Sequence, residues 1–253
     1  MKDSISSASK YRPSDFIDMI GQDAIVKTLT NAIKNDNIPQ ALLFCGPRGV
    51  GKTSCARILA KKINNLDDNF EYNIFELDAA SNNSVEDIRN ITDQIRIPPQ
   101  IGKYKVYIID EVHMLSNQAF NAFLKSLEEP PKHVVFILAT TEKNKIIPTI
   151  LSRCQIYDFK KVDNLSITKL LETICVDKKI KFDINSLALI AEKSDGSVRD
   201  SLSIFDRLIS FTNSDLKIKD VAFNLNVLDY DTYFNMSNLI INKNIPEILR
   251  NYN

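Results

Sequence analysis

The segment spanning residues 46–53 has the residue types and spacing that a nucleoside triphosphate site needs. It reads G-P-R-G-V-G-K-T and fits the pattern G-x-x-x-x-G-K-T. Glycines allow backbone N–H groups to approach phosphates closely, and the positive end of a following helix favours a bound anion. Lys52 would reach the β- and γ-phosphates, and the Thr53 hydroxyl would be a ligand of Mg²⁺. The predicted nucleotide-binding residues here are Gly46, Pro47, Arg48, Gly49, Val50, Gly51, Lys52, Thr53 and Ser54.

Two acidic residues follow an apolar stretch later in the chain. Residues 105–109, K-V-Y-I-I, predict a buried strand, and Asp110 and Glu111 come directly after it. Ligands of parallel α/β sheets bind at the carboxyl ends of strands, so Asp110 would hold the Mg²⁺ and Glu111 would polarise an attacking water. The alternative is a solvated acidic pair, which is the weaker reading beside the glycine-rich segment. His113 and His133 are interpreted as structural, because neither has a partner at metal-ligand spacing.

Short apolar stretches alternate with helical patterns over the first two thirds of the chain. Such alternation favours a parallel, doubly wound α/β sheet. Ile25, Leu29 and Ile33 are four residues apart and predict one face of an early helix. The strands are expected over 41–44, 73–77, 105–109 and 134–139, and further helices over 54–63, 84–94, 117–127 and 148–151.

From about residue 162 the pattern predicts helices only. Asp195 and Gly196 are expected to end the second of them. We therefore expect an α/β domain over 1–161, a small helical domain over 162–223 and the start of another helical domain over 224–253. The helices are expected over 165–177, 184–194, 198–212, 229–239 and 245–253.

The composition argues against several classes of protein. The 32 basic residues balance the 32 acidic ones, so no overall positive field indicates nucleic-acid binding. The four cysteines include no C-x-x-C pair, and Cys45 and Cys154 are interpreted as reduced packing thiols of a cytosolic protein. No apolar run is long enough to span a membrane, and the N-terminus lacks a signal-peptide core. We expect a cytoplasmic protein.

Six motifs occur in an order that resembles one family. They resemble the ATPase subunits of the bacterial sliding-clamp loader, the gamma/tau subunits of DNA polymerase III. The resemblance implies an AAA+ protein: a RecA-like P-loop NTPase domain that uses ATP and Mg²⁺, a three-helix lid, and a helical collar that builds a pentameric ring with related AAA+ subunits. The motifs lie at residues 46–53, 110–115, 127–131, 139–141, 152–154 and 196–200.

The resemblance also implies roles for residues outside the phosphate loop. Thr141 matches the sensor-1 position, Arg153 the arginine finger that acts on a neighbour's nucleotide, and Arg199 the sensor-2 arginine. The alternatives are a turn residue for Thr141 and a surface ion pair for Arg153. For Arg199 the alternative is a pairing with Asp195 or Asp200. The segment that would lie along the nucleotide base is Tyr11, Arg12 and Pro13.

The implied function is an ATP-driven motor that loads the sliding clamp onto primed DNA. The implied partners are the other clamp-loader subunits, the sliding clamp, primer–template DNA and the DNA polymerase III core. The family carries the label DNA-directed DNA polymerase, but the chain has no second carboxylate set for two-metal nucleotidyl transfer. One alternative is a subunit of the same ring that binds ATP without turnover. Another interprets D-E-V-H as a DExH helicase motif, but the helical remainder cannot supply the second RecA-like domain that such helicases need.

A DNA contact is expected beside the helix predicted over 84–94. A capping pattern begins at Ser84, so the positive helix end and its free N–H groups offer a phosphate site, and Arg89 lies further along the helix. The alternative is an ordinary capped surface helix. The candidate DNA-contact residues are Ser81, Asn82, Asn83, Ser84 and Arg89.

The chain also departs from the family pattern. Many relatives carry a four-cysteine zinc module where this chain has residues 64–73, which contain no cysteine, and we predict no zinc. The sequence stops at Asn253, within the first part of the expected collar, which leaves open whether this chain forms a stable ring alone.

Overall fold

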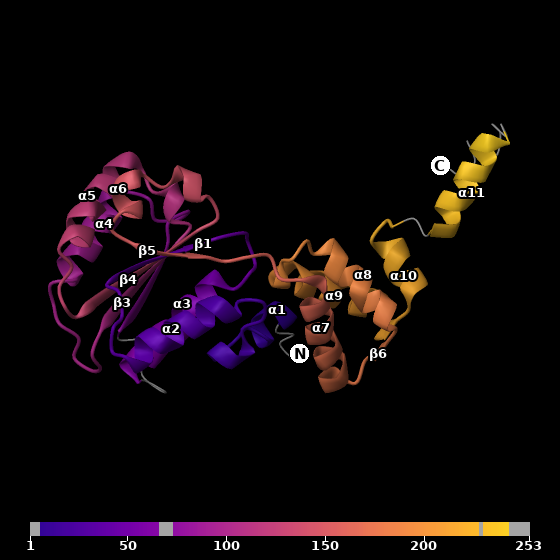
Figure 1. The fold of residues 1–253 in the computed structure, drawn as a ribbon, viewed down its shortest axis with the longest axis horizontal. Coiled ribbons are helices and arrows are strands. Elements are labelled where there is room, and N and C mark those ends of the chain that lie inside the picture. The colour runs from indigo at the N-terminus through magenta and orange to yellow at the C-terminus, as the bar shows by residue number, and fades with distance from the viewer. Residues whose placement is uncertain (1–5, 66–72, 228–229, 243–253) are drawn as a thin grey trace.

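The computed structural model describes residues 6–65, 73–227 and 230–242. An α/β region and a helical region lie side by side, and the last described helix, α11 (Tyr230–Ile241), stands apart beyond the helical region (Figure 1). The N-terminal helix α1 (Ser7–Lys10) lies beside the helical region, although the segment that follows it returns to the α/β region. The first residues of the chain therefore link the two regions.

The α/β region is built on a five-stranded sheet in the order β2-β3-β4-β1-β5, and every neighbouring pair is parallel. The doubly wound parallel sheet expected from the sequence is therefore confirmed. The fifth strand was not predicted, because its exposed end residues, Gln155 and Asp158, leave only two apolar positions between them. The strands are β1 (Ala41–Cys45), β2 (Ile74–Asp78), β3 (Lys105–Asp110), β4 (Val134–Thr140) and β5 (Gln155–Asp158).

Helices cover both faces of the sheet (Figure 1). Alternate residues of a strand point to opposite faces, so Leu42 and Phe44 of β1 enter one core while Leu43 enters the other. Parallel sheets need apolar residues on both faces, and all residues of β1 and β4 are buried. The first core packs against α2 (Asp23–Lys34) and α3 (Lys52–Asn64), and the second against α4 (Val85–Gln94), α5 (Asn117–Glu128) and α6 (Pro148–Leu151).

Local sequence signals explain where these helices begin. The Ser84 side chain accepts a hydrogen bond from the Asp87 backbone N–H, and the Asp87 carboxylate accepts one from the Ser84 N–H. This reciprocal pair confirms the capping pattern expected at the start of α4. In α2, Leu29 is fully buried and Ile25 and Ile33 pack against the same core, as their spacing predicts.

The helical region contains the three expected helices, α7 (Asn164–Lys178), α8 (Ile184–Lys193) and α9 (Val198–Phe211). The expectation of helices only was wrong. A parallel pair of two-residue strands joins β6 (Lys181–Phe182), between α7 and α8, to β7 (Asp215–Leu216), after α9. Strands of two residues are too short to produce a periodic pattern. A further helix, α10 (Ile218–Asn224), was also not predicted.

The remaining predictions for this half of the chain have mixed outcomes. The helix expected over 229–239 corresponds to α11, and that expected over 245–253 lies outside the described residues. The proposed domain boundaries at 161 and 223 stay predictions. In the part of the chain that the structure describes, no helix has both the length and the apolar character needed to cross a membrane.

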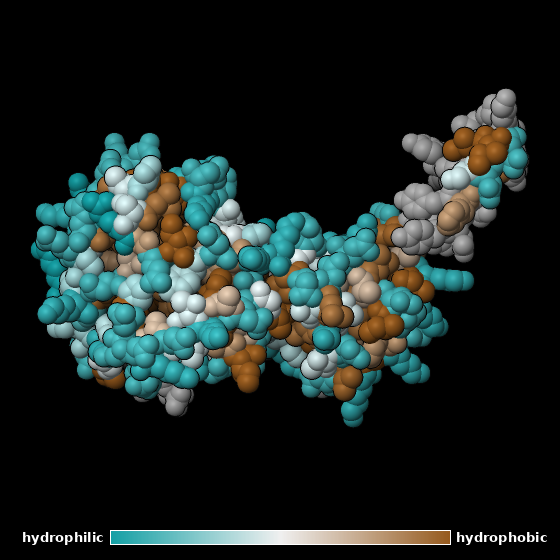
Figure 2. Space-filling view, in the orientation of Figure 1, coloured by the Kyte–Doolittle hydropathy of each residue, from teal (hydrophilic) through white to brown (hydrophobic). Residues whose placement is uncertain are grey.

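Apolar side chains also reach the surface. Figure 2 shows them over the helical region and in a strip over the α/β region, amid largely hydrophilic surroundings. On the helical region, Val176 is 68% exposed and Phe223 76% exposed. These side chains contribute nothing to the core and leave apolar surface open to a partner.

Candidate nucleotide site

The phosphate loop joins β1 to α3 and touches the helical region. Gly51 precedes α3 with φ 99°, a left-handed conformation that glycine adopts without steric cost. Gly49 has φ 75°, and a Cβ built there would meet the Ser197 side chain. The Gly49 carbonyl accepts a hydrogen bond from the Val198 N–H, 3.0 Å away, at the start of α9. The loop is therefore held against the end of a helix that lies far away in the sequence.

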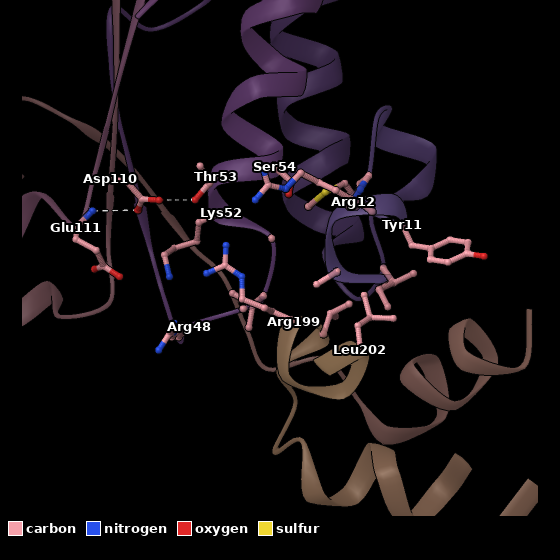
Figure 3. A pocket seen from close by; sticks show the side chains of 18 residues that line it. Tyr11, Arg12, Arg48, Lys52, Thr53, Ser54, Asp110, Glu111, Arg199 and Leu202 are labelled. Carbon is pink, nitrogen blue, oxygen red and sulfur yellow. Dashed lines mark hydrogen bonds between the residues drawn. The ribbon is translucent and has the colours of Figure 1, made fainter. Parts of the chain in front are cut away.

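Lys52 and Thr53 begin α3 and point toward the acidic end of β3. The Lys52 ammonium donates to the carbonyls of Gly46 and Pro47, both at 2.7 Å, and the residue is 6% exposed. Burial lowers the pKa of Lys52, while the nearby Glu111 carboxylate opposes that shift. The Thr53 hydroxyl donates to Asp110 Oδ2 at 2.6 Å (Figure 3). The two residues predicted as Mg²⁺ ligands are thus neighbours.

Glu111 lies one residue beyond β3 and turns toward the end of β4. Its Oε2 accepts hydrogen bonds from the Thr141 hydroxyl at 3.0 Å and from the Thr141 N–H at 3.3 Å. Thr141 follows β4, the neighbour of β3 in the sheet. The structure therefore brings together the predicted water-activating carboxylate and the predicted sensor threonine.

A pocket opens between the phosphate loop, the N-terminal segment and α9. One wall is polar and contains Lys52, Thr53 and Asp110. The other wall is apolar and was missed in the sequence, because it is assembled from separate segments that carry no common pattern. Its residues include Ala8, Met19, Ile20, Val198 and Leu202.

The nucleotide-binding residues predicted over 46–54 line this pocket, with the exception of Gly46 and Pro47. The carbonyls of Gly46 and Pro47 accept hydrogen bonds from Lys52, which lines it. Tyr11, Arg12 and Pro13 line it as well. The Tyr11 hydroxyl donates to Asp177 on α7, so this segment is bound to the helical region.

Arginine side chains add positive charge to the pocket. Arg199 lies in the first turn of α9 and points toward Lys52 (Figure 3). Its suggested alternative partner Asp195 instead pairs with Lys161 at 2.6 Å. Burial lowers the pKa of Arg12, and the nearby cations Arg57 and Arg199 lower it further. Such a concentration of cations suits a polyanionic ligand.

Thr141 contacts the pocket residue Glu111 without lining the pocket itself, and Arg153 and the candidate DNA-contact residues lie outside the pocket. Arg153 pairs with Glu128 at 2.7 Å and donates to the Thr149 carbonyl, also at 2.7 Å. It does not line the pocket of its own chain. The candidate DNA-contact residues occupy the loop before α4 and α4 itself, where Ser84 caps the helix and Arg89 is exposed. Both roles stay predictions.

His113, interpreted from the sequence as structural, lies beside Glu111. Its side chain is 6% exposed and lies 3.4 Å from Glu111 Oε2 and 3.0 Å from the Thr140 hydroxyl. The only indication of this contact in the sequence was the position of His113, two residues after Glu111. His133, by contrast, bonds to the Ile95 carbonyl at 2.9 Å, away from the pocket, in agreement with a structural role.

The described residues offer little support for a further metal site or for a reactive thiol. Among the described residues, no group of three or more histidine, cysteine or acidic side chains could hold a metal ion. Asp110 together with the Thr53 hydroxyl remains the candidate Mg²⁺ pair. Burial raises the pKa of Cys45 to about 11, so this thiol beside the phosphate loop stays protonated at neutral pH.

Two family models match the chain. The model described as DNA polymerase III, delta subunit, matches residues 21–163. The model described as DNA polymerase III clamp loader subunit, ATPase lid domain, matches residues 166–214. Together they cover the five-stranded sheet with its helices and α9, which lines the pocket from the other side.

Curated relatives are similar over nearly the whole chain. The tau subunit of DNA polymerase III from Bacillus subtilis is 41% identical over 96% of this chain and 46% of its own length. The gamma subunit from Buchnera aphidicola subsp. Baizongia pistaciae is 38% identical over 96% of this chain and 70% of its own length. The chain spans about half the length of the tau relatives it matches.

Solved structures show the same fold. The RuvB Holliday junction branch migration motor of Thermotoga maritima has a TM-score of 0.68 and 19% identity, over 91% of this chain and 79% of that one. At this identity the likeness shows the fold alone. The RecA-like P-loop NTPase fold with an ATPase lid, expected from the sequence, is thereby confirmed.

Proposed function

This chain belongs to the gamma/tau family of DNA polymerase III clamp-loader subunits, and from that premise we propose that it binds and hydrolyses ATP to load a sliding clamp onto primed DNA. The observation that carries the proposal is the meeting of the phosphate loop with the acidic end of β3, where the Thr53 hydroxyl lies 2.6 Å from Asp110. This is the arrangement that triphosphate chemistry with Mg²⁺ requires.

The polar wall would bind the triphosphate. The N–H groups of the loop and the positive end of α3 would face the phosphates, and Lys52 would exchange its loop carbonyls for phosphate oxygens. Thr53 and Asp110 would hold Mg²⁺, which neutralises charge on the phosphates when bound. The apolar wall, with Met19 and Leu202, would cover the base.

Glu111 would orient and polarise the attacking water. A general base must lie within about 2.6–3.2 Å of the proton that it accepts, directly or through one water. The hydrogen bonds from Thr141 limit the positions that the carboxylate can take. Arg199, in the first turn of α9, would contact the γ-phosphate and transmit its loss to the helical region.

Completion of the site requires a neighbour in an oligomeric ring. Arg153 lies outside its own pocket, so we propose that it reaches the nucleotide of the adjacent subunit, where an arginine finger contributes roughly 10³–10⁵ in rate. Exposed Val176 and Phe223 support contacts with neighbouring subunits. Mixed rings of Arg153→Ala and Lys52→Ala chains should recover part of the turnover; no recovery in a confirmed mixed ring contradicts the trans role.

The further partners follow from the family. We propose the other clamp-loader subunits, the sliding clamp, the DNA polymerase III core and primer–template DNA, within the cytoplasm where the chromosome is replicated. The loop before α4 and Arg89 would contact the DNA backbone. Loss of one phosphate contact in Arg89→Ala should reduce the logarithmic salt slope of DNA binding by roughly one, and an unchanged slope would remove Arg89 from the interface.

A Glu111→Gln variant tests the proposed function. It keeps the phosphate loop and the cation ligands intact and removes the group that accepts the proton. We expect parental ATP affinity with turnover reduced by about 10²–10⁴-fold in the assembled loader. Equal turnover in variant and parent would favour a subunit that binds ATP without hydrolysing it. Asp36→Asn is the control, since Asp36 pairs with Lys103 outside the nucleotide pocket.

A further inference from the structure

A buried imidazole lies close to the carboxylate of Glu111, the proposed water-activating group. The His113 side chain is 6% exposed, with Nδ1 3.4 Å from Glu111 Oε2 and Nε2 3.4 Å from Glu142 Oε1. Nδ1 is also 3.0 Å from the Thr140 hydroxyl. One ring therefore bridges two carboxylates from different loops, and the chemistry proposed above gives it no task.

The backbone brings His113 and Glu111 together. Glu111 has φ 47° and ψ 42°, a left-handed conformation that is uncommon for residues other than glycine. The 3₁₀ helix η3 (Val112–Met114) follows, and the Met114 N–H donates to the Glu111 carbonyl at 2.8 Å. This tight reversal folds residue 113 back toward residue 111. A strained residue at a site invites a functional explanation.

His113 is itself held in place from the far side. The Thr140 hydroxyl that contacts its ring also accepts a hydrogen bond from the Glu142 N–H at 3.0 Å. The Glu142 side chain binds Lys145 Nζ at 2.8 Å, in the turn η4 (Lys143–Lys145). The hydrogen bond from Lys145 lowers the pKa of Glu142, so this carboxylate stays charged at neutral pH. A continuous series of contacts thus runs from Glu111 to a partly exposed turn.

We propose that His113 is a positioning residue that sets the orientation of the Glu111 carboxylate, and that Glu142 holds the imidazole in place. This inference rests on the proposed ATPase function. Thr141 donates two hydrogen bonds to Glu111 Oε2, and the imidazole Nδ1 lies 3.4 Å from the same oxygen. The imidazole and Thr141 together would therefore fix the position of Oε2, and with it the direction of the carboxylate. Outer partners of this kind typically contribute a factor of about 10–100 to activity.

His113→Ala provides the main test, measured as ATP turnover in the assembled loader. We expect kcat to fall about 10- to 100-fold while ATP affinity stays parental, because the imidazole does not line the pocket. His113→Asn should recover part of the loss, since its amide can reach the Thr140 hydroxyl from the position of Nδ1. Unchanged kcat in His113→Ala, with an active parent, would overturn the role.

A double-variant cycle separates positioning from general damage. If His113 acts through Glu111, His113→Ala should cause no further loss in single-turnover hydrolysis when Glu111 is already glutamine. An equal loss in both backgrounds would overturn the proposal. An inactive parent, or a Glu111→Gln variant with parental turnover, would instead overturn the ATPase function on which it rests. The two failures are thus distinguishable.

A surface variant keeps the test decisive if replacement of the buried ring prevents folding. Glu142 is 41% exposed, so Glu142→Gln should fold normally, loosen the imidazole and lower kcat about 2- to 5-fold at parental ATP affinity. Asp158→Asn is the matched control: it breaks the 2.9 Å pair with Lys143 in the same turn without touching His113. Equal kcat in the two variants and the parent would overturn the role of Glu142 in holding the ring.

Discussion

The two sides of the pocket are held by different kinds of interaction. On the side of the sheet, Lys52 is buried and the Thr53 hydroxyl binds Asp110 at 2.6 Å, within a sheet packed on both faces. On the side of the helical region, Arg199 is exposed and the Tyr11 hydroxyl binds the exposed Asp177. The groups on the phosphate side are therefore fixed by packing, whereas the contacts on the lid side are exposed and take little free energy to break.

This difference suggests how binding and motion are divided. Rigid groups fix the triphosphate geometry, and weaker contacts let the lid respond to the nucleotide. Loss of a charged group on the phosphate side should therefore affect ATP binding most. Substitution of Gly49, where the phosphate loop meets Ser197 and Val198, should affect both binding and stability, and loss of the contact between Tyr11 and Asp177 should have the smallest effect.

The largest effect is expected for Lys52→Ala. A hydrogen bond to a charged group contributes about 1.5–3 kcal/mol, so ATP affinity should fall roughly 10- to 150-fold, as measured by calorimetric titration. Lys62→Ala on the same helix is the control, since Lys62 pairs with Asp15 outside the pocket and its loss should leave ATP affinity unchanged. Similar affinities for the two variants would contradict the assignment of the phosphate side.

An intermediate effect is expected for Gly49→Ala, at the contact between the phosphate loop and α9. The left-handed φ of 75° disfavours alanine by about 1–2 kcal/mol, and the new Cβ would displace Ser197, which caps α9. We expect the thermal midpoint to fall by roughly 4–8 °C and ATP affinity by about tenfold.

Gly102→Ala is its matched control. Gly102 has φ 78°, and a Cβ there would lie 2.7 Å from Asn73 Nδ2, so a comparable strain arises far from the nucleotide. Its thermal midpoint should fall while ATP affinity stays parental. If Gly49→Ala lowers stability alone, the contact between loop and α9 has no part in binding.

The smallest effect is expected for Tyr11→Phe, which removes only the hydroxyl. Tyr11 and then Lys10 lower the pKa of Asp177 through hydrogen bonds. A carboxylate with a lowered pKa in the folded state stabilises above its unfolded pKa, near 4, and this stabilisation disappears as pH falls through the lower folded value. The parent should therefore be slightly more stable than the variant at pH 7, and denaturant midpoints should converge below about pH 4.

Convergence is the informative result, because a difference that persists in acid would mean that the Tyr11 hydroxyl stabilises the segment independently of the charge on Asp177. The same comparison of ATP affinity should show a change of no more than a few-fold.

The sequence allowed prediction of the features whose signals are local. The glycine spacing around Lys52, the apolar run before Asp110 and the capping pattern at Ser84 each depend on neighbours in the chain, and each has its expected place in the structure. The polar wall of the pocket could be assembled from these signals together with the rule that strands end at one edge of a parallel sheet.

Features that depend on distant pairing could not be predicted. β5 has polar residues at both ends and gains its identity from pairing with β1. Leu202 belongs to the pocket only because α9 packs against the phosphate loop. His113 acquires its surroundings from β4 and the loop after it, so its isolated position gave no indication of its contacts.

The central place of β1 in the sheet also has a consequence for the order in which the protein can fold. β1 is made early in synthesis, yet both of its partners are made late: Ala41 aligns with Phe136 of β4, and Leu42 with Gln155 of β5. Such non-local pairing is slow, because long loops must close before any contact stabilises them. The apolar residues 41–45 therefore stay unpaired until the ribosome has made β4, which ends at Thr140, and in that interval they are exposed to aggregation and to chaperones.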